Sequence, residues 1–387
     1  MNRREVTQRI RRSLSEAGFE PLGVTPAITP SGYHRLCEWI EKGFGGTMEY
    51  LRNRKAAYQD PKSVLSGVRS IVVGAWRYPN VLPPSVEQGD GRIARYASIG
   101  IDYHDVIHNG TKPILRSLRS EFVDESFRVV VDTAPLLERD FATHAGLGWR
   151  GKNTLVLRRD IGSYFFLFCL LTTLELEYDD PFEEEFCGRC TACLDHCPTD
   201  ALVDPHVLDA RKCISYLTIE HRGSIDRDLR LGMGDWIFGC DVCQEVCPWN
   251  RRSIRRGGLI EVERDTHSVS PLGLTIQASD FITMSDDEFR KRFRKTPLWR
   301  TGRVGMARNA AIVLGNSGDE GATGTLVHGL SDDSAIVREA CVWALWQIGS
   351  AKAKRTLRTA LESEDDQAVR LEIELSLETQ NEHNSLQ

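Results

Sequence analysis

The chain has 387 residues, of which 41% are hydrophobic and 27% charged, and its formal net charge is −6. This composition is typical of a folded globular protein and excludes a fibrous or disordered one, and the length predicts two or three domains. The negative charge argues against a protein whose whole surface binds nucleic acid.

Residues 1–180 carry the pattern of a mixed α/β domain. Helical periodicity in 6–17 and 33–42 alternates with β-branched runs in 70–75, 127–131 and 154–157. The longest apolar run, 164–171, is far shorter than the roughly 20 residues of a membrane span and predicts a buried strand. The N-terminal residues are charged and show no signal-peptide pattern. We therefore expect a cytoplasmic protein without a membrane anchor.

Asp132 directly follows the run 129–131 and is the first candidate for chemistry. A partly shielded carboxyl group at the end of a strand could hold a proton and deliver it to a leaving oxygen. The structural alternative is that Asp132 caps the following helix, with Pro135 near its first turn. Both interpretations remain open at this point.

The glycines Gly146, Gly148 and Gly151 do not match the dinucleotide-binding fingerprint, which argues against a Rossmann site. Glycine has no Cβ, so these positions could let the backbone approach a large planar or macrocyclic ligand. Lys152 and Asn153 follow directly and would supply polar contacts for such a ligand.

Residues 181–255 contain eight of the eleven cysteines. Cys187, Cys190, Cys193 and Cys197-Pro198 have the spacing of a bacterial ferredoxin, and the run from Cys240 to Cys247-Pro248 is its partner with the first cysteine displaced. The pattern predicts two [4Fe–4S] clusters, because the last cysteine of each run ligates the other cluster. We assign one cluster to Cys187, Cys190, Cys193 and Cys247, and the second to Cys197, Cys213, Cys240 and Cys243. A pair of zinc sites is the alternative.

A basic segment at 289–308 contains eight Lys or Arg and no Asp or Glu. A local positive patch on an acidic protein indicates a phosphate-bearing partner, although solvated basic helix faces would give the same pattern. The candidate nucleic-acid contacts are Arg290, Lys291, Arg292, Arg294, Lys295, Arg300, Arg303 and Arg308.

The C-terminal region repeats itself. The stretch 308–315 is echoed by 338–349 and 370–377, with second helical segments and acidic turns between them. Paired helices at this period are typical of HEAT repeats, which bind partners along a concave surface; a plain helical cap is the alternative. The predicted fold is therefore α+β multidomain, with an α/β domain at 1–180, a ferredoxin-like domain at 181–255, a basic connecting segment at 256–305 and HEAT-like repeats at 306–387.

The ordered set of motifs resembles the epoxyqueuosine reductase family. The resemblance is carried by VDTAPLLERDFATHAGLGWRGKN (131–153), GSYFFL (162–167), the two cysteine runs and GCDVCQEVCPWNR (239–251). It implies a cobalamin-dependent iron–sulfur enzyme that completes queuosine at the wobble position of tRNA by reducing an epoxide to an alkene. It also implies Asp132 as the proton donor to the departing oxygen. The clusters need an external electron donor, which the sequence does not identify, and one active site with one electron path could be complete within a monomer. The residues that the resemblance places around the corrin are Tyr103, His104, Lys152, Asn153, Gly162, Ser163, Ser215 and Thr218.

Two other functions fit parts of the pattern. A cobalamin and iron–sulfur reductase of a small molecule, similar to reductive dehalogenases, would not need the basic segment at 289–308. A non-enzymatic electron carrier would leave residues 1–180 and Asp132 without a use. Both are weaker interpretations of the sequence than a tRNA-modifying reductase.

Overall fold

The structure is a computed structural model that describes residues 2–78, 85–255 and 272–384. It divides into two compact units, the first made of residues 1–81, 101–211 and 242–268 and the second of 82–100, 212–241 and 269–387. Because both units are discontinuous in sequence, they do not test the predicted boundaries at 180, 255 and 305, which stay predictions. Residues 256–271 of the predicted connecting segment lie outside the described residues.

The first unit is built around a four-stranded antiparallel sheet. Its order is β1 (Leu22–Pro26), β2 (Ser70–Arg77), β7 (Phe165–Thr172) and β4 (Phe127–Val130). The predicted strands at 70–75, 127–131 and 164–171 are confirmed, whereas 154–157 contributes only the short β6 (Val156–Leu157).

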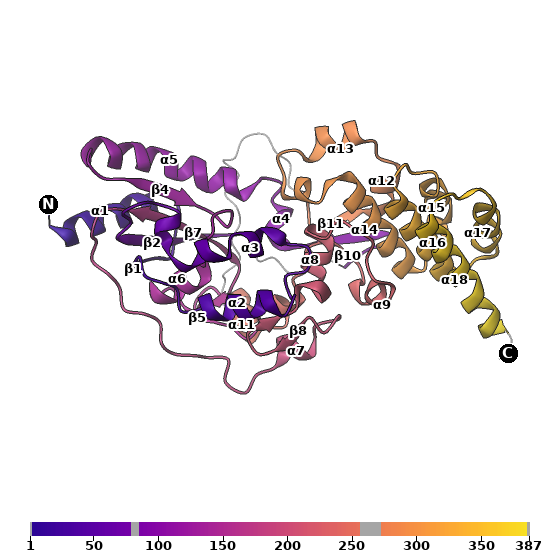
Figure 1. Ribbon diagram of the computed structural model, residues 1–387, viewed down its shortest axis with the longest axis horizontal. Coiled ribbons are helices and arrows are strands. Elements are labelled where there is room, and N and C mark those ends of the chain that lie inside the picture. Colours follow the sequence, from indigo (N-terminus) through magenta and orange to yellow (C-terminus); the bar gives the residue numbers. More distant parts are fainter. Residues whose placement is uncertain (1, 79–84, 256–271, 385–387) are drawn as a thin grey trace. The chain divides into compact units, whose positions relative to one another are not determined.

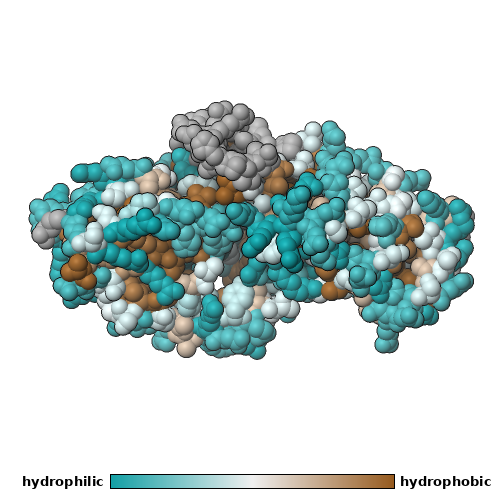
Figure 2. Space-filling model, turned by 90° about the horizontal axis from the view of Figure 1, so that it is seen from above, coloured by the Kyte–Doolittle hydropathy of each residue, from teal (hydrophilic) through white to brown (hydrophobic). Residues whose placement is uncertain are grey.

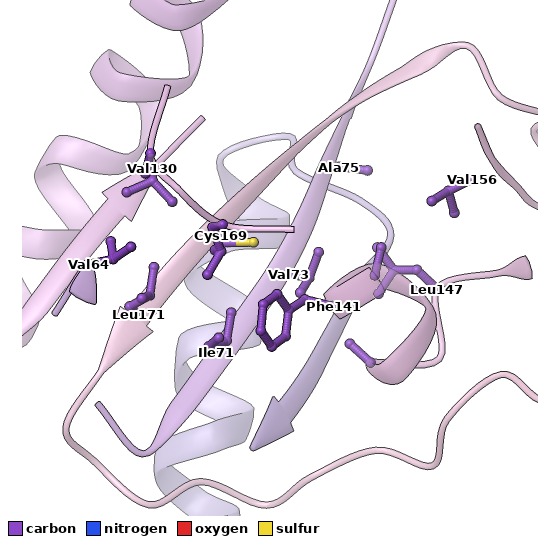
Figure 3. Packing of buried hydrophobic residues seen from close by; sticks show 14 of the residues in the cluster. Val64, Ile71, Val73, Ala75, Val130, Phe141, Leu147, Val156, Cys169 and Leu171 are labelled. Carbon is purple, nitrogen blue, oxygen red and sulfur yellow. The ribbon is translucent and has the colours of Figure 1, made fainter. Parts of the chain in front are cut away.

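Helices cover both faces of this sheet, because successive side chains of a strand point to opposite sides. Ile71 and Val73 of β2 join Phe141 of α6 (Glu138–His144) in one core (Figure 3). Val72 points the other way and packs in a core with residues of α1 (Arg3–Glu16) and α5 (Tyr103–Glu121). Figure 1 shows these two helices beside the sheet. Burial of each such large apolar side chain contributes about 1.5–3 kcal/mol, which explains why most residues of the central strands are apolar.

The cysteine-rich part of the first unit consists of short elements. Two single-turn helices, α7 (Ala192–Asp195) and α10 (Val242–Glu245), pack against each other, and α11 (Pro248–Arg255) follows α10. The remaining elements of this unit are α2 (Tyr33–Glu41), α3 (Glu49–Asn53), η1 (Lys55–Gln59), η2 (Pro61–Ser63), β5 (Trp149–Arg150), β8 (Leu202–Asp204), β9 (Val207–Leu208) and η3 (Ala210–Lys212), whose last residue belongs to the second unit.

The second unit combines a small sheet with stacked helices. The sheet has the order β10 (Trp236–Phe238), β3 (Asp90–Ile93) and β11 (Thr275–Gln277). The helices α14 (Gly302–Ser317), α16 (Ala335–Ile348) and α18 (Gln367–Asn384) stack in this order, and α15 (Thr323–Gly329) and α17 (Ala351–Ser363) are the second members of the pairs. The other elements are α4 (Arg95–Ser98), α8 (Ile214–Ile219), α9 (Arg227–Arg230), η4 (Leu231–Met233), α12 (Ala278–Thr283), α13 (Asp286–Phe293), η5 (Pro297–Arg300) and η6 (Glu320–Ala322).

Ion pairs tie the helical repeats together. Arg303 donates to the carboxylate of Asp332 at 2.7 and 3.1 Å, and Arg338 donates to Glu364 at 2.8 and 2.9 Å. The acidic turns seen in the sequence therefore bind arginines of the preceding repeat helix, which supports the HEAT-like interpretation.

Hydrophilic residues predominate on the face drawn in Figure 2, and hydrophobic residues form scattered patches on it. Of the helices that the structure describes, none combines the length and the hydropathy that crossing a membrane requires.

Candidate catalytic and cofactor sites

Asp132 occupies an unusual turn directly after β4. Its φ of +43° lies in the left-handed region, which non-glycine residues seldom adopt and which clusters at functional sites. Its backbone N–H donates to Oε1 of Glu138 at 2.8 Å. Helix α6 starts only at Glu138, and its N-cap residue is Leu137, which makes no side-chain cap hydrogen bond. The helix-capping alternative for Asp132 is therefore wrong.

The carboxylate of Asp132 receives two donors from the start of α5. The Tyr103 hydroxyl donates to Oδ2, and the His104 ring Nε2 lies 2.8 Å from Oδ1. On its other side the His104 ring Nδ1 lies 2.7 Å from Oδ1 of Asp102, the N-cap residue of α5. The side chain of Asp132 remains 49% exposed. The arrangement fixes a carboxylate in place while leaving it open to a reacting group.

The charges of this network depend on one another. Burial would lower the pKa of His104, but its hydrogen bonds and charge interactions with Asp102 and Asp132 raise it to about 10. Burial would raise the pKa of Asp102, but the hydrogen bonds from His104 outweigh this effect and lower that pKa. The pKa of the partly buried Glu138 is raised to about 8 by desolvation and by the charge of Asp132. At neutral pH His104 is therefore a cation and Glu138 is mostly protonated.

An aromatic surface adjoins the network. The Tyr103 ring stacks on Phe166 with centroids 3.9 Å apart and an interplanar angle of 11°. Phe166 in turn stacks on Trp76 of the neighbouring strand at 5.9 Å and 13°. These three rings are only partly buried. Flat apolar rings beside a hydrogen-bonded acid suit a large planar ligand.

Four of the predicted cluster ligands surround one cavity in the first unit. Cys187, Cys190, Cys193 and Cys247 line a volume of about 210 Å³ together with Lys152, Asn153, Leu157, Phe186, Ala192, Pro248, Trp249 and Arg252. Among the described residues no group of three or more His, Cys, Asp or Glu could hold a metal ion. Thiols spread around a cavity fit a polynuclear cluster better than a compact zinc site.

The chemistry of this cavity also fits a cluster. Burial, followed by the neighbouring thiols of Cys247 and Cys187, raises the pKa of Cys193 to about 11, so these thiols need a bound cation to ionise together. The indole N–H of Trp149 is a buried donor with no acceptor among the described residues, and Trp149 packs with Cys247. Hydrogen-bond donors near the sulfurs are among the groups that set the reduction potential of an iron–sulfur cluster.

The proposed ligands of the second cluster belong to different segments. Cys197 accepts the N–H of Ala201 at 3.3 Å, and the backbone carbonyl of Cys243 accepts the Asn153 amide at 3.3 Å. Cys213 is the N-cap residue of α8, and Cys240 follows β10 after Gly239. The assignment of these four cysteines to one cluster stays a prediction. The remaining Cys169 and Cys341 are fully buried, as expected of core residues, and Cys37 is partly buried.

The glycines after Asp132 serve internal packing rather than a ligand. A Cβ on Gly148 would lie 2.1 Å from the carbonyl oxygen of Leu157, and one on Gly151 would lie 2.5 Å from the Leu157 side chain. A Cβ on Gly146 would lie 2.7 Å from the carbonyl oxygen of Asp180. The expectation that these glycines admit a macrocycle is therefore replaced by close approach between chain segments.

Several residues predicted around the corrin are engaged elsewhere. The Lys152 ammonium donates to the carbonyls of Gly188 and Cys190 at 2.7 and 3.1 Å, so it lies at the cysteine cavity. The other predicted corrin contacts, apart from Tyr103 and His104, are Asn153, Gly162, Ser163, Ser215 and Thr218. Ser163 is 5% exposed and its hydroxyl accepts the side-chain amides of Gln244 and Asn250.

A Cβ on Gly162 would lie 2.0 Å from Oδ1 of Asn250, so this glycine too is fixed by internal packing. Thr218 is completely buried and accepts the N–H of Gly239, whereas Ser215 is partly exposed. Tyr103 and His104 keep partly exposed rings beside Asp132.

The basic segment divides into exposed and engaged residues. Arg308 is 1% exposed and donates to internal carbonyls, so its prediction as a nucleic-acid contact is wrong. Arg303 is held by Asp332, Arg300 by Glu220 and Arg292 by Asp280. Among the described residues of this segment, the exposed cations that form no ion pair with a carboxylate are Arg290, Lys291, Arg294 and Lys295.

Sequence reasoning missed two residues that contribute to these sites. Glu138 is part of the quoted 131–153 motif, but only the left-handed turn at Asp132 reveals that its carboxyl group accepts the Asp132 N–H. Trp149 lies in the same motif, and its packing against Cys247 joins segments almost a hundred positions apart. The only available signal was their place inside a dense motif.

The fold and the sites together define an iron–sulfur protein of the α+β class. It contains a cysteine-lined cavity and, in the same unit, a carboxylate held in place by hydrogen bonds. Residues 186–250 match the family model of the 4Fe-4S double cluster binding domain, residues 59–133 that of epoxyqueuosine reductase QueG, DUF1730, and residues 304–378 that of HEAT repeats.

The chain belongs to the epoxyqueuosine reductase family. It is 37% identical over 351 residues to the epoxyqueuosine reductase of Xanthomonas campestris, which covers 89% of this chain and 97% of that protein. The enzyme of Escherichia coli is 35% identical over 350 residues, 89% of each chain. Family membership and the HEAT repeats agree with the expectations from the sequence.

Solved structures agree over nearly the whole chain. A crystal structure of epoxyqueuosine reductase with an epoxyqueuosine-modified tRNA-Tyr stem loop has a TM-score of 0.87 at 30% identity and covers 97% of this chain and 98% of that one. The structure of epoxyqueuosine reductase from Bacillus subtilis, with a catalytic loop swung out of the active site, has a TM-score of 0.84 at 29% identity and covers 97% of this chain and 98% of that one.

Proposed function

We propose that this protein is an epoxyqueuosine reductase, which reduces the epoxide of epoxyqueuosine at the wobble position of tRNA to give queuosine. The observation that carries the proposal is the half-exposed Asp132 carboxylate, fixed by Tyr103 and His104, in a chain of this family. The overall change adds two electrons and two protons to the epoxide. Both protons end on the oxygen, which leaves as water, and the carbon–carbon double bond remains.

Two [4Fe–4S] clusters and a cobalamin would serve this reaction. The first cluster would occupy the cavity lined by Cys187, Cys190, Cys193 and Cys247. The aromatic surface of Trp76, Phe166 and Tyr103, beside the acid, would hold the corrin ring. Cobalamin would supply the reducing centre for the epoxide, and the clusters would supply it with single electrons from an external donor.

The protein side of the reaction is proton delivery. Asp132 is a carboxylate in the resting network, so it would take a proton from the cationic His104 through the 2.8 Å contact between His104 Nε2 and its Oδ1, and pass it to the departing oxygen as a general acid. Solvent would supply the second proton and reprotonate His104. Asp102 holds the other ring nitrogen, so the ring keeps one orientation. Glu138 holds the turn through the Asp132 N–H.

The tRNA would be held by the exposed cations of α13 and the residues after it. Arg290, Lys291, Arg294 and Lys295 present an uncompensated positive surface next to Trp299, which is 43% exposed. Positive side chains with an exposed aromatic ring bind phosphates and stack on unpaired bases. The reaction needs the modified base outside the anticodon stack, as in other enzymes that act on bases. We place the protein in the cytoplasm as a monomer, where thiols stay reduced for cluster ligation.

The test compares two substrate classes on one enzyme. The protein is reconstituted anaerobically with iron, sulfide and cobalamin, reduced, and given either a tRNA stem loop with epoxyqueuosine or a halogenated aromatic compound. We expect alkene product only from the stem loop. Dehalogenation without alkene formation would favour a small-molecule reductase, and no reaction with either substrate, despite bound corrin and reduced clusters, would contradict both.

A further inference from the structure

The segment between Cys213 and Cys240 has little structure of its own. Cys213 is the N-cap residue of the six-residue helix α8, and Cys240 follows the three-residue strand β10 after Gly239. Helices this short do not form by themselves in water, and short strands are equally dependent on their neighbours. The positions of both thiols therefore depend on contacts that residues outside these short elements make with them.

Arg308 of α14 makes the first of these contacts. It is 1% exposed, and its guanidinium donates to the carbonyls of Leu217, His221 and Gly223 at 2.6, 2.8 and 2.7 Å. These carbonyls lie at the end of α8 and just beyond it, where helix carbonyls have no partner inside the helix. Burial lowers the pKa of Arg308 to about 10, so it is still charged at neutral pH. Burying a charged group costs more free energy than burying an apolar one. Packing of α14 alone would therefore be better served by an apolar side chain at position 308.

Asn309, the next residue, connects α8 with β10. Its amide Nδ2 donates to the carbonyls of Thr218 and Ile237, each at 2.9 Å, while its Oδ1 accepts from Arg308 at 2.8 and 3.1 Å. The Thr218 hydroxyl in turn accepts the N–H of Gly239, the residue before Cys240, at 2.9 Å. Continuous hydrogen bonds therefore run from α14 to the helix that Cys213 starts and to the backbone next to Cys240.

We propose that Arg308 and Asn309 are positioning residues for the second [4Fe–4S] cluster, so that the first HEAT helix is part of the cluster scaffold. The inference rests on the proposed function in one respect, the assignment of Cys213 and Cys240 as ligands. Displacing ligands by about 1 Å is enough to loosen a metal site. The hydrogen bonds of the pair restrain two of the four thiols through the backbone that carries them.

The matched comparison uses two asparagines of the same helix. Asn309→Asp keeps the size of the side chain and removes both donors. Asn316→Asp makes the same change seven residues later, where the amide donates to the carbonyls of Arg230 and Gly234 at 2.9 and 2.8 Å, at the end of α9 and after η4 and thus outside the two elements, α8 and β10, that adjoin the cysteines. Two four-iron clusters give eight irons per chain. We expect Asn309→Asp to lose half of its iron and one of two electron paramagnetic resonance spins, while Asn316→Asp keeps both.

A milder pair covers the case that Asn309→Asp does not fold. Thr218→Val deletes the acceptor for Gly239, and Thr218→Ser keeps it. We expect a changed spectrum and faster loss of one cluster under chelator in the first and wild-type behaviour in the second. Full iron and unchanged spectra in Asn309→Asp or Thr218→Val, or equal iron loss in Asn316→Asp, would overturn the proposal. Because iron and spin are counted without tRNA, failure of the proposed activity gives a different result, namely full iron without alkene.

Discussion

Replacement of Asp132 by asparagine is the most informative single change in the catalytic network. Asn keeps the size of the side chain and one oxygen acceptor, but it can neither donate a carboxyl proton nor carry a negative charge. The Asp132 N–H remains available to Glu138. Both electron-carrying cofactors should therefore still bind, while the group that protonates the departing oxygen is lost.

The magnitude follows from the role of the carboxyl group. General acid catalysis contributes about 10²–10⁴-fold in rate, or about 3–5 kcal/mol of transition-state stabilisation. The second effect concerns His104, whose pKa is raised to about 10 by two carboxylates, Asp102 and Asp132. With Asp132 neutral, only Asp102 still favours the cation, so the pKa of His104 must fall.

Two measurements follow these effects. Anaerobic single-turnover assays on an epoxyqueuosine stem loop report the rate, and nuclear magnetic resonance titration of the His104 ring reports its pKa. The control is Asp105→Asn, which neutralises an exposed carboxyl group in the first turn of the same helix. A rate for Asp132→Asn within about threefold of wild type would refute the general-acid role, and an unchanged His104 titration would refute the charge coupling between Asp132 and His104.

The neighbouring groups give three further predictions. Glu138→Gln keeps an acceptor for the Asp132 N–H and should retain turnover. Glu138→Ala should lower the turnover rate at least tenfold, since the loss of a buried acceptor costs about 1–3 kcal/mol. Equal turnover rates in the two variants would show that Glu138 does not hold the Asp132 turn. Because the pKa of His104 is raised from 6.5 to about 10, its stabilisation is complete below pH 6.5 and lost as pH rises through 10. Urea unfolding of His104→Gln should therefore show a flatter stability profile between these values, and parallel profiles would contradict this. The double variant Lys291→Gln/Arg294→Gln should reduce the salt dependence of tRNA binding by a slope of roughly one per lost phosphate contact, and an unchanged slope would place the tRNA elsewhere.

The sequence was sufficient where the signal is local. The cysteine spacing predicted that Cys187, Cys190 and Cys193 share a site, and Cys247 was added because a ferredoxin run sends its last cysteine to the other cluster. All four line one cavity. Buried strands and repeat helices were equally visible, because periods of 2 and 3.6 in hydrophobicity report one chain segment at a time.

The sequence failed where a residue's role depends on a distant segment. Arg308 was grouped with surface cations because charge along a chain does not reveal which face of a helix is buried. Its partners are carbonyls about ninety positions earlier. Gly148 was interpreted as a ligand contact, yet the Leu157 carbonyl of a neighbouring strand needs its space. Backbone groups bear no sequence signature, so contacts with them become visible only in the folded chain.

The most direct test of the proposed function is the mass of the modified nucleoside after one turnover. The enzyme is loaded with both clusters and cobalamin, reduced chemically, and mixed without oxygen with a tRNA stem loop that carries epoxyqueuosine. We expect the nucleoside to lose one oxygen atom and gain an alkene, in wild-type and Asp105→Asn protein but not in Asp132→Asn. Recovery of unchanged epoxyqueuosine from fully loaded and reduced wild-type protein would contradict the proposed function.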